Sequence, residues 1–155
     1  MCAYLCALGV TLKYMQMMRF ETQDNIDRED RAIKKFCEIF KGSSRKMGPN
    51  DIDFKVYDRD GNIVAYAEVK GRHRPMASAF PLPVGASKVV KLCEKNSTPV
   101  IIWACDDGII YGKPMEIEGR AVWGGRKPRK GSVNDQRLMI YYKEQESLTH
   151  IPYED

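Results

Sequence analysis

Apolar and polar residues alternate most clearly in two stretches, residues 50–57 and 63–70, separated by the turn sequence Asp-Arg-Asp-Gly-Asn at 58–62. Alternation with a period of two indicates β-strands, and aspartate with glycine between two such stretches favours a tight turn. The pattern therefore predicts a β-hairpin. Its two faces differ, because one carries mainly apolar side chains and the other carries most of the charged ones.

The register of this hairpin decides which charged side chains meet. If Asp58 pairs with Ile63, the next opposed pairs are Tyr57–Val64, Lys55–Tyr66 and Asp53–Glu68. Opposed residues in antiparallel strands have β-carbons about 4.5–5.5 Å apart, so two carboxylates would lie side by side, with Lys70 nearby on the same face. Like charges at that separation destabilise a sheet. We therefore expect a cation between them.

Helical spacing of apolar residues predicts a helix over residues 25–41, which begins at Asn25 or the preceding aspartate and ends before Gly42. Glu29 falls within the apolar stripe of this helix. A buried carboxylate is costly unless it is paired or bound to a metal, so Glu29 is either a site residue or a first-turn residue that reaches solvent. A second helix is predicted over residues 84–95.

The other segments are predicted to be strands and loops. Residues 99–105 form a continuous apolar run suited to the interior of a sheet, and we expect this strand to lie beside the strand that carries Glu68. The Asp-Asp-Gly turn that follows predicts a second hairpin with residues 109–111, and a closing strand is expected at 138–142. Proline, glycine and basic residues predict loops at 42–49, 71–83 and 119–130.

Composition limits the class of protein. The chain has 155 residues, a net charge of +4, five cysteines and two histidines. This length fits one domain with a real core. An odd number of cysteines without a Cys-x-x-Cys pair argues against a disulfide framework and against structural zinc. Reduced cysteines indicate a cytoplasmic protein, in the host cytoplasm if a phage encodes it.

The first 18 residues differ from the remainder. They are largely apolar at first, yet they lack the basic start of a signal peptide and are too short to span a membrane. We expect an N-terminal extension at 1–18 that is an over-extended reading frame, a poorly ordered arm, or an extra element covering a sheet edge. Residues 19–155 are expected to form a single domain, with no membrane association.

The polar face of the first hairpin suggests hydrolytic chemistry. Two carboxylates offer the hard oxygen ligands that Mg²⁺ prefers, and Mg²⁺ keeps waters that can attack a phosphate. A neighbouring lysine can position such a water and offset developing charge. The alternative is an ordinary solvated hairpin face.

Asp53 followed by Glu68-Val69-Lys70 resembles the motif of the PD-(D/E)XK nuclease superfamily, in particular its small phage-type members. The resemblance implies an α/β (α+β) fold of the restriction-endonuclease-like type, with an αβββαβ core and a mixed central sheet flanked by helices. It also implies that Mg²⁺, for which Mn²⁺ would substitute, is held by Asp53, Glu68 and the Val69 carbonyl. Lys70 would orient the attacking water, and Glu29 on the first helix would complete the site. Asp51 is the competing candidate for the aspartate of the motif.

Basic residues in three segments are the candidate nucleic-acid contacts. Arg72 and Arg74 follow the Glu68 strand, and Lys88 occupies a helical position at which some phage-type superfamily members carry a lysine directed at the site. Segment 119–130 contains arginines, lysines and Trp123 but no acidic residue, which suits a DNA-backbone contact. The residues predicted to contact nucleic acid are Arg72, Arg74, Lys88, Arg126 and Arg129.

Two functions remain open on the sequence. The first is a metal-dependent deoxyribonuclease, an endonuclease that acts in phage recombination, resolution or nicking. The second is a nucleic-acid-binding module of the same fold that has weak or no catalysis. DNA is the expected partner, RNA is an alternative, and a homodimer is compatible with either.

Overall fold

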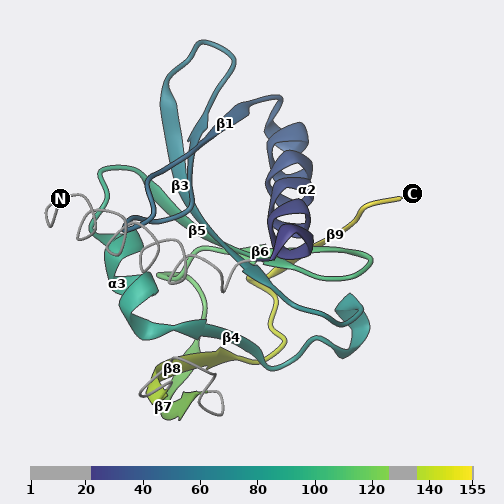
Figure 1. Ribbon diagram of the computed structural model, residues 1–155, viewed down its shortest axis with the longest axis vertical. Coiled ribbons are helices and arrows are strands. Elements are labelled where there is room, and N and C mark those ends of the chain that lie inside the picture. Colours follow the sequence, from purple (N-terminus) through teal and green to yellow (C-terminus); the bar gives the residue numbers. More distant parts are fainter. Residues whose placement is uncertain (1–21, 126–135, 155) are drawn as a thin grey trace, which may run out of the picture.

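Strand β3 (Ile63–Gly71) lies inside a six-stranded mixed sheet in the order β1-β2-β3-β5-β6-β9. The computed structural model describes residues 22–125 and 136–154 and has an α+β fold, with helices α2 and α3 packed against the sheet (Figure 1). A second sheet of three strands has the order β4-β8-β7. The other elements are α2 (Gln23–Phe40), β1 (Ser43–Lys46), β2 (Phe54–Tyr57), η2 (Met76–Ser78), β4 (Leu82–Gly85), α3 (Ala86–Cys93), β5 (Thr98–Ala104), β6 (Gly108–Gly112), β7 (Gly119–Gly125), β8 (Gln136–Tyr142) and β9 (Thr149–Pro152).

The alternation along β3 divides the core into two layers. Ala65, Ala67 and Val69 are buried in one cluster with the apolar stripe of α2. Their neighbours Tyr66 and Glu68 point to the opposite face, where Tyr66 packs against a second core cluster that includes Leu92 of α3 and Trp103 of β5. The period of two along this strand thus separates the face packed on α2 from the face that carries Glu68 and lies toward α3.

The predicted hairpin is confirmed, and its register is correct where it matters for the site. Lys55 lies opposite Tyr66, and Phe54 lies opposite Ala67, so Asp53 comes to the level of Glu68. Tyr57, however, pairs with Ile63 rather than Val64, because the ladder is irregular between Val56 and Tyr57. The bulge absorbs one residue next to the turn and leaves the register at the carboxylate end unchanged.

Helix α2 begins two residues earlier than predicted, at Gln23, because Thr22 caps it. The Thr22 hydroxyl accepts a hydrogen bond from the Asn25 backbone N–H at 3.3 Å, which satisfies one of the free donors of the first turn. The helix ends where Lys41 adopts a left-handed conformation with φ 51°, next to the predicted stop at Gly42.

Helix α3 connects β3 to β5, which run parallel, as expected for the strand beside Glu68. The order α2-β1-β2-β3-α3-β5 is the predicted αβββαβ core, with β4 inserted before α3. The helix is shorter than predicted, at 86–93 instead of 84–95, because Val84 belongs to β4.

Three segments predicted as loops contain strands, so these predictions were wrong. Segment 42–49 contains β1, an edge strand of Ser, Ser, Arg and Lys whose composition shows no strand pattern. Segment 71–83 contains a 3₁₀ turn and the start of β4, and the described part of 119–130 is β7. Pairing with another strand stabilises each of them: β1 pairs with β2 and β7 with β8, each the next strand of the chain, whereas β4 pairs with β8, far along the chain.

Trp103 joins the small sheet to the large one. Its indole Nε1 donates a hydrogen bond to the Pro83 carbonyl at 2.8 Å, and its ring meets Tyr142 edge-on with 5.6 Å between centroids. Trp103 is fully buried. No helix in the described part of the chain combines the length and the apolar character needed to cross a membrane.

We predict that Trp103→Phe lowers the free energy of unfolding by about 2–3 kcal/mol, because it leaves the Pro83 carbonyl without its donor and opens a small cavity. Urea denaturation followed by circular dichroism measures this. The matched control is Trp123→Phe, since Trp123 is 75% exposed and its replacement should change stability by no more than about 0.5 kcal/mol. Equal stability of the two variants would contradict the bridging role of Trp103.

Candidate active site

Asp53 and Glu68 lie at the end of the first hairpin that is remote from its turn. Asp53 immediately precedes β2, and its Oδ2 accepts a hydrogen bond from the Val69 backbone N–H at 2.8 Å. Glu68 lies in the middle of β3 and is only 1% exposed. The Asp53–Val69 hydrogen bond holds the first carboxylate beside the strand that carries the second.

Two lysines from different elements converge on one oxygen of Glu68. Lys70 Nζ lies 3.2 Å from Glu68 Oε1, and Lys88 Nζ lies 3.8 Å from the same atom. Lys70 is on the same face of β3, whereas Lys88 comes from the first turn of α3. The second oxygen, Glu68 Oε2, is buried and has no hydrogen-bond partner among the described residues. A buried charge without a full set of partners is costly, so this oxygen is suited to accept a further ligand.

The proximity of the two carboxylates changes the pKa of Asp53. Burial, and next the charge of Glu68, raise the pKa of Asp53 to about 6, against the lowering effects of the Val69 N–H, Lys70 and Lys88. A carboxylate pair that resists full ionisation favours a bound cation.

The structure separates Asp51 from this cluster. Asp51 Oδ1 lies 2.7 Å from Lys95 Nζ and accepts a hydrogen bond from the Ile52 N–H. These hydrogen bonds, first that of Lys95, lower the pKa of Asp51. Asp51 is thus turned toward the end of α3, and Asp53 is the aspartate that lies next to the Glu68 strand.

Glu29 lies on the sheet-facing side of α2 and is partly buried. It precedes Ala32 and Ile33 by one helical turn, and these two pack with Val69 on the face of the sheet opposite Glu68. The role of Glu29 in the site therefore stays a prediction. Its partial burial agrees with the position in the apolar stripe from which the prediction was made.

The residues present fit a Mg²⁺ ion in the chemistry of their donors. Asp53 and Glu68 supply carboxylate oxygens, and Mg²⁺ commonly binds one or two carboxylates while keeping several waters. Within residues 22–125 and 136–154, no group of three His, Cys, Asp or Glu side chains is placed to hold a metal. That the Val69 carbonyl would be a further ligand stays a prediction from the resemblance.

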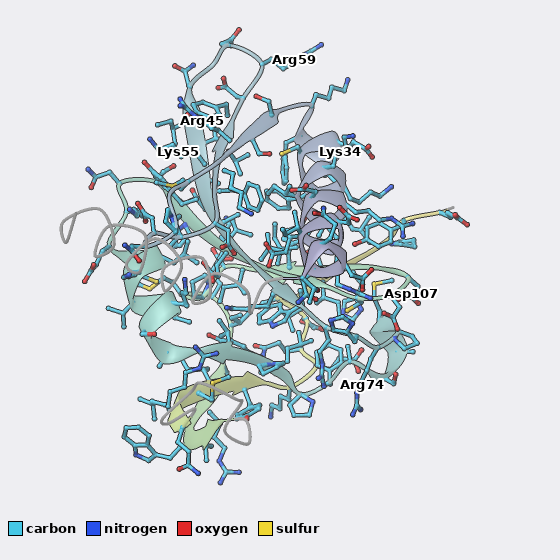
Figure 2. All side chains as sticks on the ribbon, in the orientation of Figure 1. Lys34, Arg45, Lys55, Arg59, Arg74 and Asp107 are labelled. Atoms are coloured by element: carbon cyan, nitrogen blue, oxygen red, sulfur yellow. The ribbon has the colours of Figure 1, made fainter. Side chains whose placement is uncertain are left out.

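The predicted nucleic-acid contacts differ in their surroundings. The Arg72 guanidinium donates to the carbonyls of Ala79 and Pro81 at 2.7 and 3.4 Å, so it holds the loop before β4. Arg74 is exposed and points away from the body of the molecule (Figure 2). Arg126 and Arg129 lie outside the described residues.

Lys88 was predicted both as a lysine directed at the site and as a nucleic-acid contact. The structure places its ammonium group beside the Glu68 carboxylate. Its contact with nucleic acid stays a prediction.

These features define a restriction-endonuclease-like fold with a PD-(D/E)XK motif at its hairpin. The chain matches the family described as phage putative PDDEXK endonuclease over residues 15–149, and it belongs to that family. The resemblance and the fold class that the sequence suggested are thereby confirmed. Neither the curated proteins nor the solved structures include a significant match to the chain.

The raised pKa of Asp53 predicts a stability gain from removing its charge. The folded-state pKa of about 6 exceeds the ordinary value near 4, so the stability that Asp53 contributes is lost as pH rises from about 4 to about 6. In metal-free buffer, Asp53→Asn should therefore raise the free energy of unfolding by about 1–3 kcal/mol at pH 8 and have little effect at pH 4. Urea denaturation at the two pH values measures the difference.

The matched control is Asp51→Asn. Because the pKa of Asp51 is lowered, removing its charge should destabilise the protein slightly at pH 8. A gain for Asp51→Asn with none for Asp53→Asn would show that the two carboxylates have been assigned to the wrong environments.

Proposed function

We propose that this protein is a Mg²⁺-dependent endonuclease that hydrolyses phosphodiester bonds of DNA and acts in phage DNA metabolism, in recombination, resolution or nicking. Membership of the phage endonuclease family supports nuclease activity on nucleic acid. The observation that carries the metal dependence is the buried Glu68 carboxylate, which has two lysines on one oxygen and, among the described residues, no partner on the other.

Each polar residue of the site has a role that its position allows. Asp53, Glu68 and the Val69 carbonyl would hold Mg²⁺, which when bound would acidify a water and offset charge on the phosphate; Mn²⁺ would substitute. Lys70, with its partly exposed ammonium group, would orient the attacking water.

Lys88 approaches the Glu68 carboxylate from a separate element, α3. Its positive charge would offset the negative charge that develops on the phosphate oxygens. In the reaction a bond forms between the water oxygen and phosphorus, the bond to the leaving oxygen breaks, and the leaving oxygen takes a proton.

A nucleic-acid-binding module without catalysis is the second candidate. The site argues against it, since two neighbouring carboxylates repel phosphate unless a cation lies between them. Arg74, exposed beyond the end of β3, would serve DNA binding in either case. The proposed substrate is DNA, with RNA as the alternative. The proposed site of action is the cytoplasm, and a homodimer is compatible with the proposal.

We predict that Glu68→Gln and Lys70→Met each lower the rate of Mg²⁺-dependent cleavage of supercoiled plasmid by about 10²–10³-fold, the order of the cost of removing one preorganised group that stabilises a transition state. Asp53→Asn should be equally deficient although it is more stable. Gel assays of nicking and linearisation measure the rate, and Asp51→Asn is the control that should keep activity.

A metal-binding measurement distinguishes the two proposed metal ligands, Asp53 and Glu68, from Lys70, which would orient the water. Titration with Mn²⁺ by calorimetry, without DNA, should show no binding in Asp53→Asn and Glu68→Gln but retained binding in Lys70→Met. Full activity in Asp53→Asn together with inactivity of Asp51→Asn would overturn the site; wild-type metal binding without cleavage of any nucleic acid would favour the binding module.

For Glu29 the two interpretations predict opposite results. If Glu29 completes the metal site, Glu29→Gln should lower metal affinity and activity, by about 10-fold for an outer ligand, without a change in stability. If Glu29 is only a charge on a partly buried stripe, Glu29→Leu should stabilise α2 and leave turnover unchanged. Calorimetry, urea denaturation and plasmid cleavage on both variants distinguish the two.

A further inference from the structure

Arg45 of β1 and Lys55 of β2 are register partners in the six-stranded sheet. Opposed residues in antiparallel strands place their side chains on the same face, with β-carbons about 4.5–5.5 Å apart. Two positive charges therefore stand opposite each other, and Figure 2 shows the two labelled side chains close together on the β1–β2 side of the molecule. Like charges in this arrangement destabilise a sheet, so the pair would gain from an anion bound between its two members.

The Arg45–Lys55 pair lies on the same face of the sheet as Glu68. Lys55 is the register partner of Tyr66, which is two residues before Glu68 on β3, and side chains two residues apart on a strand share a face. Tyr66 packs against the core cluster on the α3 side of the sheet. Met47, two residues after Arg45, packs against the same cluster. The positions on β1 and on β3 therefore agree.

The register also places the pair next to the two carboxylates. Asp53 comes to the level of Glu68, and Lys55 with Tyr66 forms the next pair along the same face. Two residues of a strand span about 6.4–6.8 Å. Each strand of duplex DNA has a phosphate about every 3.4 Å along the helix axis. A phosphate that flanks the one at the carboxylates is therefore within reach of the Arg45–Lys55 pair.

Neither member of the pair forms an ion pair with another residue in the ranges 22–125 and 136–154. Lys95, which also approaches Tyr66, with 5.7 Å between its ammonium nitrogen and the ring centroid, is neutralised by Asp51 at 2.7 Å. The fold thus pairs the cation that follows α3, whereas the charges of Arg45 and Lys55 have no counter-charge in the described part of the chain.

Protection of the sheet edge explains only part of this arrangement. Strand β1 is at the edge of the sheet, and charged residues on edge strands prevent pairing with other molecules. Arg45 and Lys46 on β1 can serve that purpose. Lys55, however, is on β2, which lies between β1 and β3 and has no free edge. A second cation at this position therefore needs another reason.

We propose that Arg45 and Lys55 bind a backbone phosphate of the nucleic acid, one that flanks the scissile phosphate on the β1 side of the candidate active site. The proposal rests on the proposed nuclease function and adds a phosphate-binding site that positions the substrate strand. Membership of an endonuclease family makes nucleic acid the anion expected beside the two carboxylates. Contacts of this kind carry no sequence preference, because phosphates are alike at every nucleotide.

The test measures binding of the full-length protein to a short labelled DNA duplex by fluorescence anisotropy, in EDTA and over a series of salt concentrations. Arg45→Gln with Lys55→Gln should weaken binding roughly 10–100-fold at low salt, as expected for lost hydrogen bonds to a charged group. The slope of log affinity against log salt should become shallower by about 0.9, the value for one neutralised phosphate. Arg45→Lys, which keeps the charge, should retain most of the affinity.

Lys34→Gln with Arg59→Gln is the matched control, because it changes the net charge by the same amount. Both residues are exposed; Lys34 is on α2, which covers the opposite face of the sheet, and Arg59 is at the β2–β3 turn (Figure 2). This variant should keep the affinity and the salt slope of the wild type. Equal losses in the two double variants would overturn the proposal, since net charge alone would then explain the binding.

Two further measurements exclude a general defect in the variant that lacks Arg45 and Lys55. Urea denaturation without DNA should find it at least as stable as the wild type, because it loses an opposed pair of like charges. In the cleavage assay with Mg²⁺ it should show a raised KM and a nearly unchanged kcat, because the pair contacts a phosphate other than the one that is cleaved.

Wild-type affinity and salt slope in this variant would overturn the proposal. Weakened binding of polyglutamate with unchanged binding of DNA would do so too, since the pair would then serve an acidic protein. Binding in EDTA needs no catalysis. A wild type that cleaves no nucleic acid, yet binds the duplex with a salt slope that depends on Arg45 and Lys55, would refute the nuclease function and leave the phosphate site. Cleavage by the double variant with the KM of the wild type would refute the phosphate site and leave the nuclease function.

Discussion

The burial of the Glu68 carboxylate is the constraint on which the rest of the structure depends. A carboxylate that is 1% exposed is tolerated in a core only if cations and hydrogen-bond donors surround it. The fold supplies two of them from separate elements, Lys70 from the same strand and Lys88 from the crossover helix. The position of α3 over the sheet, and with it the parallel pairing of β3 and β5, is thereby linked to the electrostatics of one side chain.

The aspartate of the pair is held differently. The backbone N–H of Val69 fixes Asp53 beside the Glu68 strand, and the polypeptide before β2 turns Asp51 away to Lys95. Two aspartates two residues apart therefore reach different surroundings. One has its pKa raised by burial and the other has its pKa lowered by a lysine. Only the first environment gains from a bound cation.

The sequence predicted the first hairpin because the signal there is local. Alternation in 50–57 and 63–70, with a strong turn between them, determined the strands and the Lys55–Tyr66 register. The small sheet could not be predicted in the same way, since β4 is stabilised by pairing with β8, far along the chain. Composition also gave no indication that Arg72 bonds the Ala79 and Pro81 carbonyls, because its surroundings arise only when the loop is folded.

The attachment of the small sheet has a mechanical consequence. Trp103 is the register partner of Lys70 across β3 and β5, and it also carries the hydrogen bond to Pro83. One buried residue therefore links the strand that carries Glu68 and Lys70 to the attachment of the small sheet. A displacement of the small sheet would reach the carboxylate site through this single side chain, without any contact between β7 or β8 and the site itself.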